Sequence, residues 1–96
     1  MGTEIVLQWD ERKRRANLRK HGFDFGDCAE VFSGPVDTLL DDRYEYGETR
    51  LLTYGLLRGN VVVVTHTEGG GIIRVISMRK ANQYEKENFF RNTFSD

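Results

Sequence analysis

The sequence predicts a small α+β fold in which helices cover a twisted antiparallel sheet. Three observations predict it. Two β-branched runs flank a glycine turn within residues 61–81, a basic segment near the amino end carries helix caps, and an aromatic segment near the carboxyl end opens with a capping signature. Ninety-six residues suffice for one domain, 1–96, with one modest core.

The hairpin in residues 61–81 is expected at the centre of the sheet, because its four consecutive valines predict burial on both faces. Strict alternation along its second strand puts one set of side chains on one face, namely Ile73, Val75 and Ser77. The other face carries Ile72, Arg74, Ile76 and Met78. Arg74 is then expected among hydrophobic neighbours, where a guanidinium needs an anion. Ion pairing with Glu48 or Glu68 is the structural alternative to an anion site.

The amino-terminal part predicts a strand followed by a basic helix. Residues 4–9 alternate, with Ile5, Leu7 and Trp9 on one face. Asp10 is suited to cap a helix over Glu11–His21, and Gly22 to end it in the left-handed conformation. The helix carries Arg12, Lys13, Arg14, Arg15, Arg19 and Lys20. Such a helix is either simply solvated or makes electrostatic contact with nucleic acid.

A second short helix is predicted to start near Asp24. Its apolar stripe, at positions i, i+3, i+4 and i+7, comprises Phe25, Cys28, Ala29 and Phe32. Gly34 and Pro35 end it. Because Cys28 lies on the stripe, we expect it to be packed and inert rather than a nucleophile.

The remaining chain predicts three further strands and a last helix. Residues 36–40 and Arg50–Leu57 form strands, residues 41–48 form a polar connection, and residues 57–60 form the hairpin turn before the valine strand. Asn82 and Glu85 form a capping box. The apolar side chains of this last helix are Tyr84, Phe89, Phe90 and Phe94.

Charge is close to balanced in total, at −1, but it is distributed in blocks. Residues 1–21 hold six basic and three acidic side chains, residues 22–48 one and eight, and residues 49–96 seven and four. The basic blocks suit a phosphate backbone and the acidic block a basic partner, whereas plain solvation is the alternative for each. One cysteine and two scattered histidines predict no metal site, and the absence of a long apolar run predicts a soluble, cytoplasmic protein without membrane contact.

Several motifs together resemble the BrnT family of bacterial toxins, from Trp9 to about Glu85. They are Trp9-Asp10, Lys13, Asn17-Leu18, Lys20-His21-Gly22, Phe25, Ala29, Val31-Phe32, Asp42-Arg43, Tyr46-Gly47-Glu48, Arg50, Ile73-Arg74, Ile76-Ser77 and Arg79-Lys80-Ala81. The resemblance implies a RelE-like fold with two N-terminal helices and a C-terminal helix. It also implies a ribonuclease that inhibits translation and a BrnA-like antitoxin that neutralises it and binds operator DNA. The slightly acidic total charge and the aromatic tail depart from the family pattern.

Cleavage of RNA without a metal or other cofactor requires a proton acceptor, a proton donor and cations around the developing charge. Arg74 and Arg79 are the leading candidates for the cations, and they are predicted to reach a single phosphate from one face. Arg50 joins them if its strand lies beside the hairpin, and Arg43 if its loop folds back. The candidate catalytic residues are Arg74, Arg79, Arg50, Glu48 and His21; the candidate RNA-binding residues are Lys13, Lys20, Arg43, Lys80 and Tyr84.

Structural alternatives accompany most of these side chains. At the end of its helix, His21 is also a favourable partner for the helix dipole. Glu48 is equally suited to orient Arg50 by ion pairing, and the ring of Tyr84 is equally suited to burial against the sheet. His66 is expected to be packed, because it is in phase with the valines.

Three functions remain open from the sequence. The chain is an endoribonuclease toxin, a catalytically inactive relative that holds an antitoxin in a hetero-oligomer for operator control, or a DNA-binding regulator. The third is disfavoured because the basic helix is followed by an apolar and acidic one. The antitoxin is expected on the acidic block and on exposed aromatic residues of the last helix. If Phe89, Phe90 and Phe94 instead complete the core, it must engage the basic face and mimic RNA.

Overall fold

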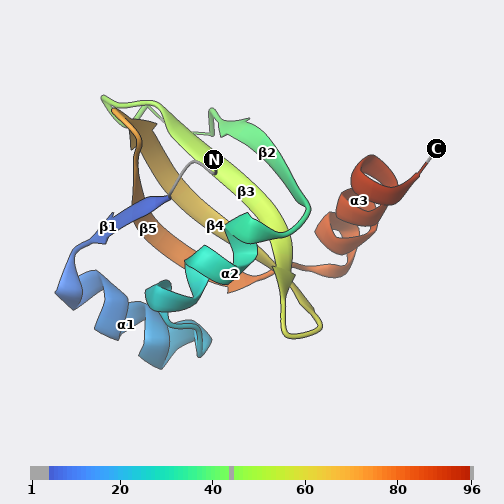
Figure 1. Ribbon diagram of the computed structural model, residues 1–96, viewed down its shortest axis with the longest axis horizontal. Coiled ribbons are helices and arrows are strands. Elements are labelled where there is room, and N and C mark those ends of the chain that lie inside the picture. Colours follow the sequence, from blue (N-terminus) through green and yellow to red (C-terminus); the bar gives the residue numbers. More distant parts are fainter. Residues whose placement is uncertain (1–4, 44, 96) are drawn as a thin grey trace.

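A computed structural model describes residues 5–43 and 45–95 and contains five strands, three α-helices and one 3₁₀ turn (Figure 1). In chain order they are β1 (Val6–Trp9), α1 (Glu11–His21), η1 (Phe25–Asp27), α2 (Cys28–Ser33), β2 (Val36–Asp41), β3 (Arg50–Leu57), β4 (Asn60–Gly69), β5 (Ile72–Lys80) and α3 (Gln83–Phe94). None of the described helices is long and apolar enough to cross a membrane.

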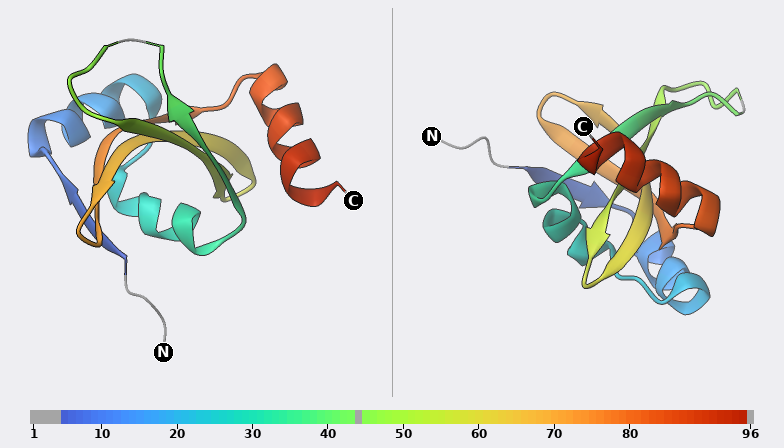
Figure 2. Two further views of the ribbon diagram at one scale, coloured as in Figure 1. Left: turned by 90° about the horizontal axis from the view of Figure 1, so that it is seen from above. Right: turned by 90° about the vertical axis from the view of Figure 1, so that its right-hand side faces the viewer.

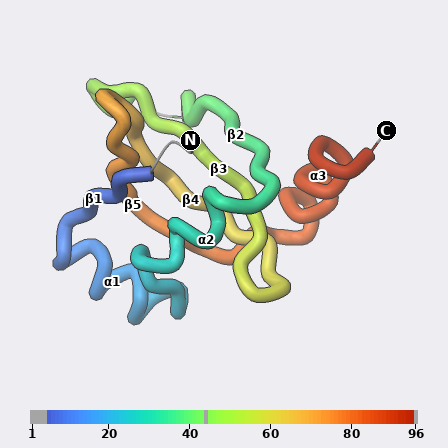
Figure 3. The backbone as a smooth tube through the Cα atoms, viewed as in Figure 1, coloured from blue at the N-terminus to red at the C-terminus, as the bar shows by residue number. Residues whose placement is uncertain are grey.

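The strands form one sheet in the order β1-β5-β4-β3-β2. Strands β2 to β5 pair in antiparallel fashion, so the predicted hairpin is confirmed, and β4 is the middle strand. The difference from the prediction is β1, which pairs with β5 in parallel. The path of the chain explains this arrangement, because α1 and α2 carry it across one face of the sheet from β1 at one edge to β2 at the other (Figure 3).

Helices lie on both faces of the sheet: α1 and α2 on one, hereafter the α1/α2 face, and α3 on the other, the α3 face (Figure 2). The valines of β4 alternate between the two cores, as predicted. The core on the α1/α2 face contains Phe25, Cys28, Val31, Leu57, Val62, Val64, Val75 and Met78. The smaller core under α3 contains Leu52, Tyr54, Val61, Val63 and Phe89.

Helix α1 has the predicted bounds because both of its ends are set by local chemistry. The Asp10 side chain accepts hydrogen bonds from the backbone N–H groups of Arg12 and Lys13, at 2.9 and 3.1 Å. Gly22 ends the helix at φ 78°, a conformation that side chains other than glycine rarely adopt.

The second helix differs from the prediction in its buried stripe. Ala29 is exposed, and Val31 is buried in its place. The reason is that the segment begins as the 3₁₀ turn η1, which has three residues per turn and so changes the phase of the stripe. Val31 packs so closely on Gly55 of β3 that a Cβ atom at that position would lie 2.6 Å from Val31 Cγ1.

Strand β5 contains an irregularity that corrects the predicted alternation. Thr65 pairs with Ser77 whereas His66 pairs with Val75, so Ile76 is an extra residue, a β-bulge. After a bulge the side chains change face, and Val75 and Met78 therefore lie in the same core. The same change puts Arg74 and Arg79 together on the α3 face, although strict alternation would have separated them.

Helix α3 begins with the predicted capping box: Asn82 Oδ1 accepts from the Glu85 N–H at 2.8 Å, and Glu85 Oε1 accepts from the Asn82 N–H at 2.9 Å. Its aromatic residues divide between the two predicted roles. Phe89 is buried in the core, whereas Phe90 and Phe94 are 40% and 55% exposed. The helix therefore completes the core with one ring and presents two to solvent.

Cys28 is fully buried, as predicted, and its inertness can be tested. Burial raises the pKa of its thiol to about 12, and the carboxylates of Asp27 and Asp24 add to the effect. Because the thiolate is the reactive form, we expect a thiol reagent at pH 8 to label the folded protein only as fast as it unfolds. Labelling rates in buffer and in urea measure this, and rapid labelling of the folded protein would contradict it.

Candidate functional site

The α3 face carries a row of polar side chains near one end of its strands. Arg74 of β5 is paired in register with Gln8 of β1 and Thr67 of β4. Because Leu51 pairs with His66, the register puts Arg50 of β3 beside Thr67. Arg50 and Arg74 thus lie two strands apart, with their Cα atoms ~10 Å from each other. Strand β3 does lie beside the hairpin, which was the condition for Arg50 to join the site.

Arg79 of β5 lies on the same face and is held by α3. Its two terminal nitrogens donate to the two carboxylate oxygens of Glu85, each at 2.8 Å. The hydroxyl of Tyr54 donates to the same carboxylate at 3.4 Å. These bonds, from Arg79 above all, hold the pKa of Glu85 below its usual range, and the pKa of Arg79 is raised in turn. Arg79 and Glu85 therefore form a charged, bidentate pair at ordinary pH.

The two leading arginines are separated along the sheet. Arg79 pairs with Val63 and Arg74 with Thr67, four residues apart on β4, a distance of ~13 Å. Both positions are on one face of the sheet, as predicted. That they contact a single phosphate remains a prediction.

Arg74 itself is exposed, and its expected hydrophobic surroundings are wrong because the bulge moves Met78 to the other face. Neither proposed carboxylate binds it. Glu48 pairs with Arg50, and Glu68 lies 3.7 Å from His66 Nδ1. Within residues 5–43 and 45–95 Arg74 makes no ion pair, which leaves its guanidinium available to an anion.

Arg50 is oriented by two neighbours. Its Nε donates to Glu48 at 3.2 Å, and its guanidinium carbon lies 4.0 Å from the ring centroid of Tyr46, a cation–π contact. The structural role considered for Glu48, that of orienting Arg50, is confirmed. The pair is partly exposed, so its atoms remain accessible from solvent.

The loop after β2 folds back on itself, which was the condition for Arg43. Its guanidinium binds both carboxylate oxygens of Asp41, at 2.8 and 3.0 Å, and the Tyr46 hydroxyl donates to the same carboxylate at 3.3 Å. The side chain of Asp41 is buried, and the bond from Arg43 lowers its pKa. Arg43 also opposes the rise in the pKa of Arg79, so the charges of the two arginines act on each other.

A groove of about 280 Å³ lies between α1 and the part of β5 that β1 does not reach. It collects three predicted residues, Lys13, Lys20 and His21, and its other lining residues are Ala16, Asn17, Ile76 and Ser77. Burial lowers the pKa of His21, and the positive charges of Lys20 and Arg79 lower it further. At neutral pH the imidazole is therefore uncharged and can accept a proton.

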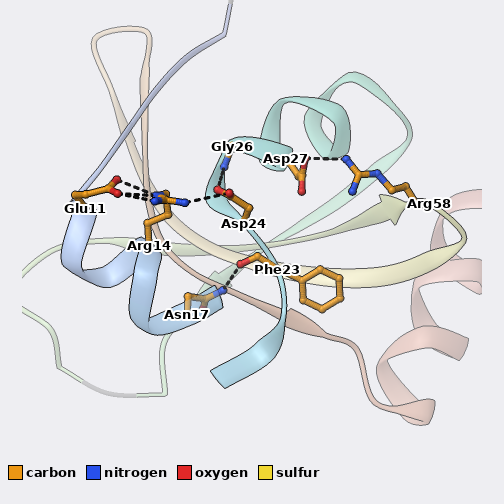
Figure 4. Close-up of polar contacts among 8 residues, drawn as sticks. All are labelled: Glu11, Arg14, Asn17, Phe23, Asp24, Gly26, Asp27 and Arg58. Atoms are coloured by element: carbon orange, nitrogen blue, oxygen red, sulfur yellow. Dashed lines mark hydrogen bonds and ion pairs between the residues drawn. The ribbon is translucent and has the colours of Figure 1, made fainter. Parts of the chain in front are cut away.

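Asn17 attaches α1, which forms one side of this groove, to β5 and to the segment before η1. Its amide group donates to the backbone oxygen of Met78 at 2.8 Å and accepts from the Met78 N–H at 3.0 Å, as a neighbouring strand would. It donates also to the oxygen of Phe23 at 3.1 Å. Figure 4 shows Asn17 beside Arg14, which bridges Glu11 and Asp24 at 2.6 and 3.0 Å. These contacts fix α1 against β5 and against the start of η1.

The other predicted side chains lie further from the arginines. Lys80 is exposed on the α1/α2 face, in register with Val62. Tyr84 is 75% exposed at the start of α3, so the structural alternative for it, burial against the sheet, is excluded, and its role in RNA binding stays a prediction. His66 is packed as predicted, with Nε2 2.7 Å from Thr53 Oγ1 and its ring against Phe32.

Sequence reasoning missed four residues that organise the site: Glu85, Tyr54, Asp41 and Asn17. The capping box drew attention to Glu85, but gave no sign of its pairing with Arg79. Asp41 had a usable signal, because it lies two residues before Arg43. Among residues 5–43 and 45–95, no three His, Cys, Asp or Glu side chains gather in a way that could hold a metal ion.

Comparisons with known proteins identify the family. Residues 9–85 match the family model of the ribonuclease toxin BrnT of type II toxin–antitoxin systems. The crystal structure of the Brucella abortus ribonuclease toxin BrnT is similar, with a TM-score of 0.66 and 32% identity over 83% of this chain and 100% of that chain. No curated protein sequence matches significantly. The chain thus belongs to the BrnT family of ribonuclease toxins of type II toxin–antitoxin systems, which implies an antitoxin partner.

Proposed function

We propose that this protein is a metal-independent endoribonuclease whose cleavage of RNA inhibits translation in the bacterial cytoplasm. One observation carries the proposal: Arg43, Arg50, Arg74 and Arg79 come from three parts of the chain to one face of the sheet, next to a groove with an uncharged histidine. Arginine is suited to this role because it is always charged and its planar fork matches phosphate oxygens.

The proposed reaction begins with the ribose 2′-hydroxyl beside the scissile phosphate. The 2′-oxygen forms a bond to phosphorus while the bond from phosphorus to the 5′-oxygen breaks, which gives a 2′,3′-cyclic phosphate and a 5′-hydroxyl end. The proton of the 2′-hydroxyl passes to an acceptor, for which His21 and Glu48 are the candidates, and a donor protonates the leaving 5′-oxygen. The arginines stabilise the negative charge that develops on the phosphoryl oxygens.

Substrate binding is assigned to side chains around these groups. Lys13 and Lys20 line the groove, and Arg43 lies near Arg79, so these three suit contacts with flanking phosphates. Lys80 lies on the α1/α2 face and suits a phosphate of an RNA strand that passes the end of β5. Tyr84 is exposed enough for an unpaired base to stack on its ring. Because Glu85 holds Arg79, a bound phosphate has to compete with that carboxylate for the guanidinium.

We further propose that the partner is a BrnA-like antitoxin, which forms a hetero-oligomer with the toxin and connects it to operator DNA. A catalytically inactive relative that serves only to hold the antitoxin is the second candidate. The specific observation in its favour is that three of the four arginines, Arg43, Arg50 and Arg79, are already neutralised by carboxylates.

Cleavage by the purified protein separates the two candidates. We expect it to cut a single-stranded RNA in the presence of EDTA and to leave cyclic phosphate ends. Induced expression should arrest growth, and co-expression of the small gene adjoining the toxin gene should restore it. Intact RNA after incubation with the folded protein, under conditions where a related toxin cleaves, would support the binding-only alternative.

The pH profile of cleavage tests His21 as the acceptor. Its pKa lies below the ordinary value of about 6.5, so the active, neutral form is lost only as pH falls through that lowered pKa. We expect kcat/KM to rise on the acid side with a midpoint below about 6.5, and His21→Gln to remove this limb together with ~100-fold or more of the rate. An unchanged acid limb in His21→Gln would exclude His21 and favour Glu48.

A further inference from the structure

We propose that the antitoxin binds along the edge strand β2 and the adjoining side of α3, through a segment in which basic and apolar side chains alternate and which adds to β2 as a new strand. The proposal rests on the proposed toxin function for its partner. It assigns that partner a surface centred on β2, which adjoins the arginines only where Glu85, the partner of Arg79, lines the groove.

Strand β2 is open on one side. Within residues 5–43 and 45–95 it pairs with β3 alone and ends the sheet, so the N–H and C=O groups of its alternate residues point outward and face no neighbouring strand. Proteins usually protect such an edge with charges, proline or a cover. The middle of this edge displays apolar side chains between Asp37 and Asp41, since Leu39 is 48% and Leu40 60% exposed. An extended peptide gains backbone hydrogen bonds and side-chain contacts at an edge of this kind.

A groove of about 380 Å³ runs beside this strand, between β2 and α3. Asp37 and Leu39 form one wall, Asn88 and Phe89 the other, and Tyr54 lies between them. Figures 1 and 2 show α3 next to β2 along this side of the molecule. Side chains on the α3 face of an added strand would enter the groove, and those on the opposite face would meet Leu40.

The apolar contacts of the proposed segment come from β2 and from the groove. Leu39 and Leu40 are exposed on the two faces of the strand, and Phe89 lines the groove. Phe90 and Phe94, whose ring centroids lie 5.8 Å apart, are exposed on the side of α3 opposite Asn88 and Asn92 and lie outside this groove.

Charge determines the chemistry of the segment. Residues 22–48 hold eight acidic side chains, but five of them, Asp24, Asp27, Glu30, Asp41 and Glu48, pair with arginines, so the unpaired charge within β2 is that of Asp37. The carboxylate of Asp37 accepts a hydrogen bond from the Asn92 amide at 3.1 Å, but among the described residues it meets no cation. A basic side chain would find a partner there, whereas an RNA phosphate would be repelled. An antitoxin that mimicked RNA would instead go to the arginines.

Two exposed residues on the two edges of the sheet form a matched pair for the test. Leu39 on β2 and Val6 on β1 are each 48% exposed, and the register puts both on the α3 face. A lysine at position 39 would repel a basic segment and remove apolar contact. The same residue at position 6 changes the protein's net charge equally, at the opposite edge.

The experiment measures binding of the co-expressed and purified product of the adjoining antitoxin gene to wild type, Leu39→Lys and Val6→Lys, with thermal unfolding of each. We expect at least a tenfold loss of affinity for Leu39→Lys and less than a threefold change for Val6→Lys. Hydrogen exchange of the wild-type complex should show new protection within Val36–Asp41. This measurement tests the surface even if Leu39→Lys does not fold.

Other results would overturn the proposal. Protection confined to α1 and β5 would point to an RNA mimic on the basic face, and protection of β1 with loss of binding in Val6→Lys would point to the other edge. Protection of β2 in the free protein at high concentration would indicate a second copy of this chain. RNA cleavage by the free toxin is scored separately, so an inactive toxin that still binds at β2 contradicts only the proposed activity.

Discussion

Replacing Arg79 by alanine is expected to slow RNA cleavage by roughly 100- to 1000-fold, the loss that follows removal of one preorganised charge-stabilising donor. Arg79 is the arginine that connects the site, because it shares a sheet face with Arg74, lies within electrostatic reach of Arg43 and acts on the pKa of His21. A cation that stabilises the transition state more than the bound RNA affects kcat as well as kcat/KM.

The stability of the same variant is expected to fall. A strand-end position alone would make the replacement nearly neutral for stability, but the contacts of Arg79 make it costly. Arg79 is about two-thirds buried and makes two hydrogen bonds to Glu85, which is itself part of the α3 capping box. Charged hydrogen bonds contribute about 1.5–3 kcal/mol, and we expect about 1 kcal/mol here because solvent screens the partly exposed guanidinium. The midpoint of thermal unfolding should then decrease by roughly 4–8 °C.

Two further variants separate catalysis from stability. Glu85→Gln breaks the same ion pair and should lower the unfolding midpoint, yet it keeps the guanidinium and should retain cleavage. Arg79→Lys keeps the charge without the planar fork and should recover part of the rate. The measurements are single-turnover cleavage, thermal unfolding and antitoxin binding. Wild-type cleavage by folded Arg79→Ala, or an equal loss in Glu85→Gln, would remove Arg79 from the chemistry.

The elements that the sequence predicted well are those whose ends are set by neighbouring residues. Asp10 and Gly22 define α1, and Asn82 with Glu85 defines the start of α3, because capping bonds involve backbone groups only a few positions away. The bulge at Ile76 gave no such signal. It depends on how β5 matches β4, a tertiary relation that reversed the face of every side chain beyond it.

The candidate site shows the same limit. The types of residue were predictable, since cations and a proton acceptor are what RNA cleavage requires, and the family resemblance added positions. The groups that these side chains contact in the folded protein were not predictable. Glu85 lies six residues from Arg79 but in a different element, and Asn17 reaches Met78 across 61 positions. For Tyr84 the sequence left a stacking surface and burial against the sheet both open, and the structure has the ring exposed to solvent.

The second large effect that we expect is the loss of stability when Asn17 is replaced. Replacement by leucine should destabilise the fold by about 2–4 kcal/mol, because it leaves the N–H and C=O of Met78 without partners at a buried position, at about 1–3 kcal/mol for each group. The hydrogen bond to Phe23 O is lost as well. For a domain of this size the unfolding midpoint should decrease by roughly 10–25 °C.

The same change is expected to weaken cleavage in a distinctive way. Asn17 holds α1 on β5, and α1 carries Lys20 and His21, so a loosened helix should move the imidazole away from Arg79. The acid limb of the pH profile should then shift toward the ordinary histidine value near 6.5, since burial, the main cause of the lowered pKa, and the positive charge of Arg79 both depend on α1 lying against β5.

Asn92→Leu provides the control, because it removes one exposed amide hydrogen bond and should change stability by about 0.5 kcal/mol or less. Chemical denaturation at 25 °C, together with cleavage measured at a temperature where each variant is folded, makes the comparison. If Asn17→Leu were as stable as Asn92→Leu, water would have to bind the backbone N–H and C=O of Met78 in the variant. The two hydrogen bonds between Asn17 and Met78 would then not be what holds α1 against the sheet and forms the groove between them.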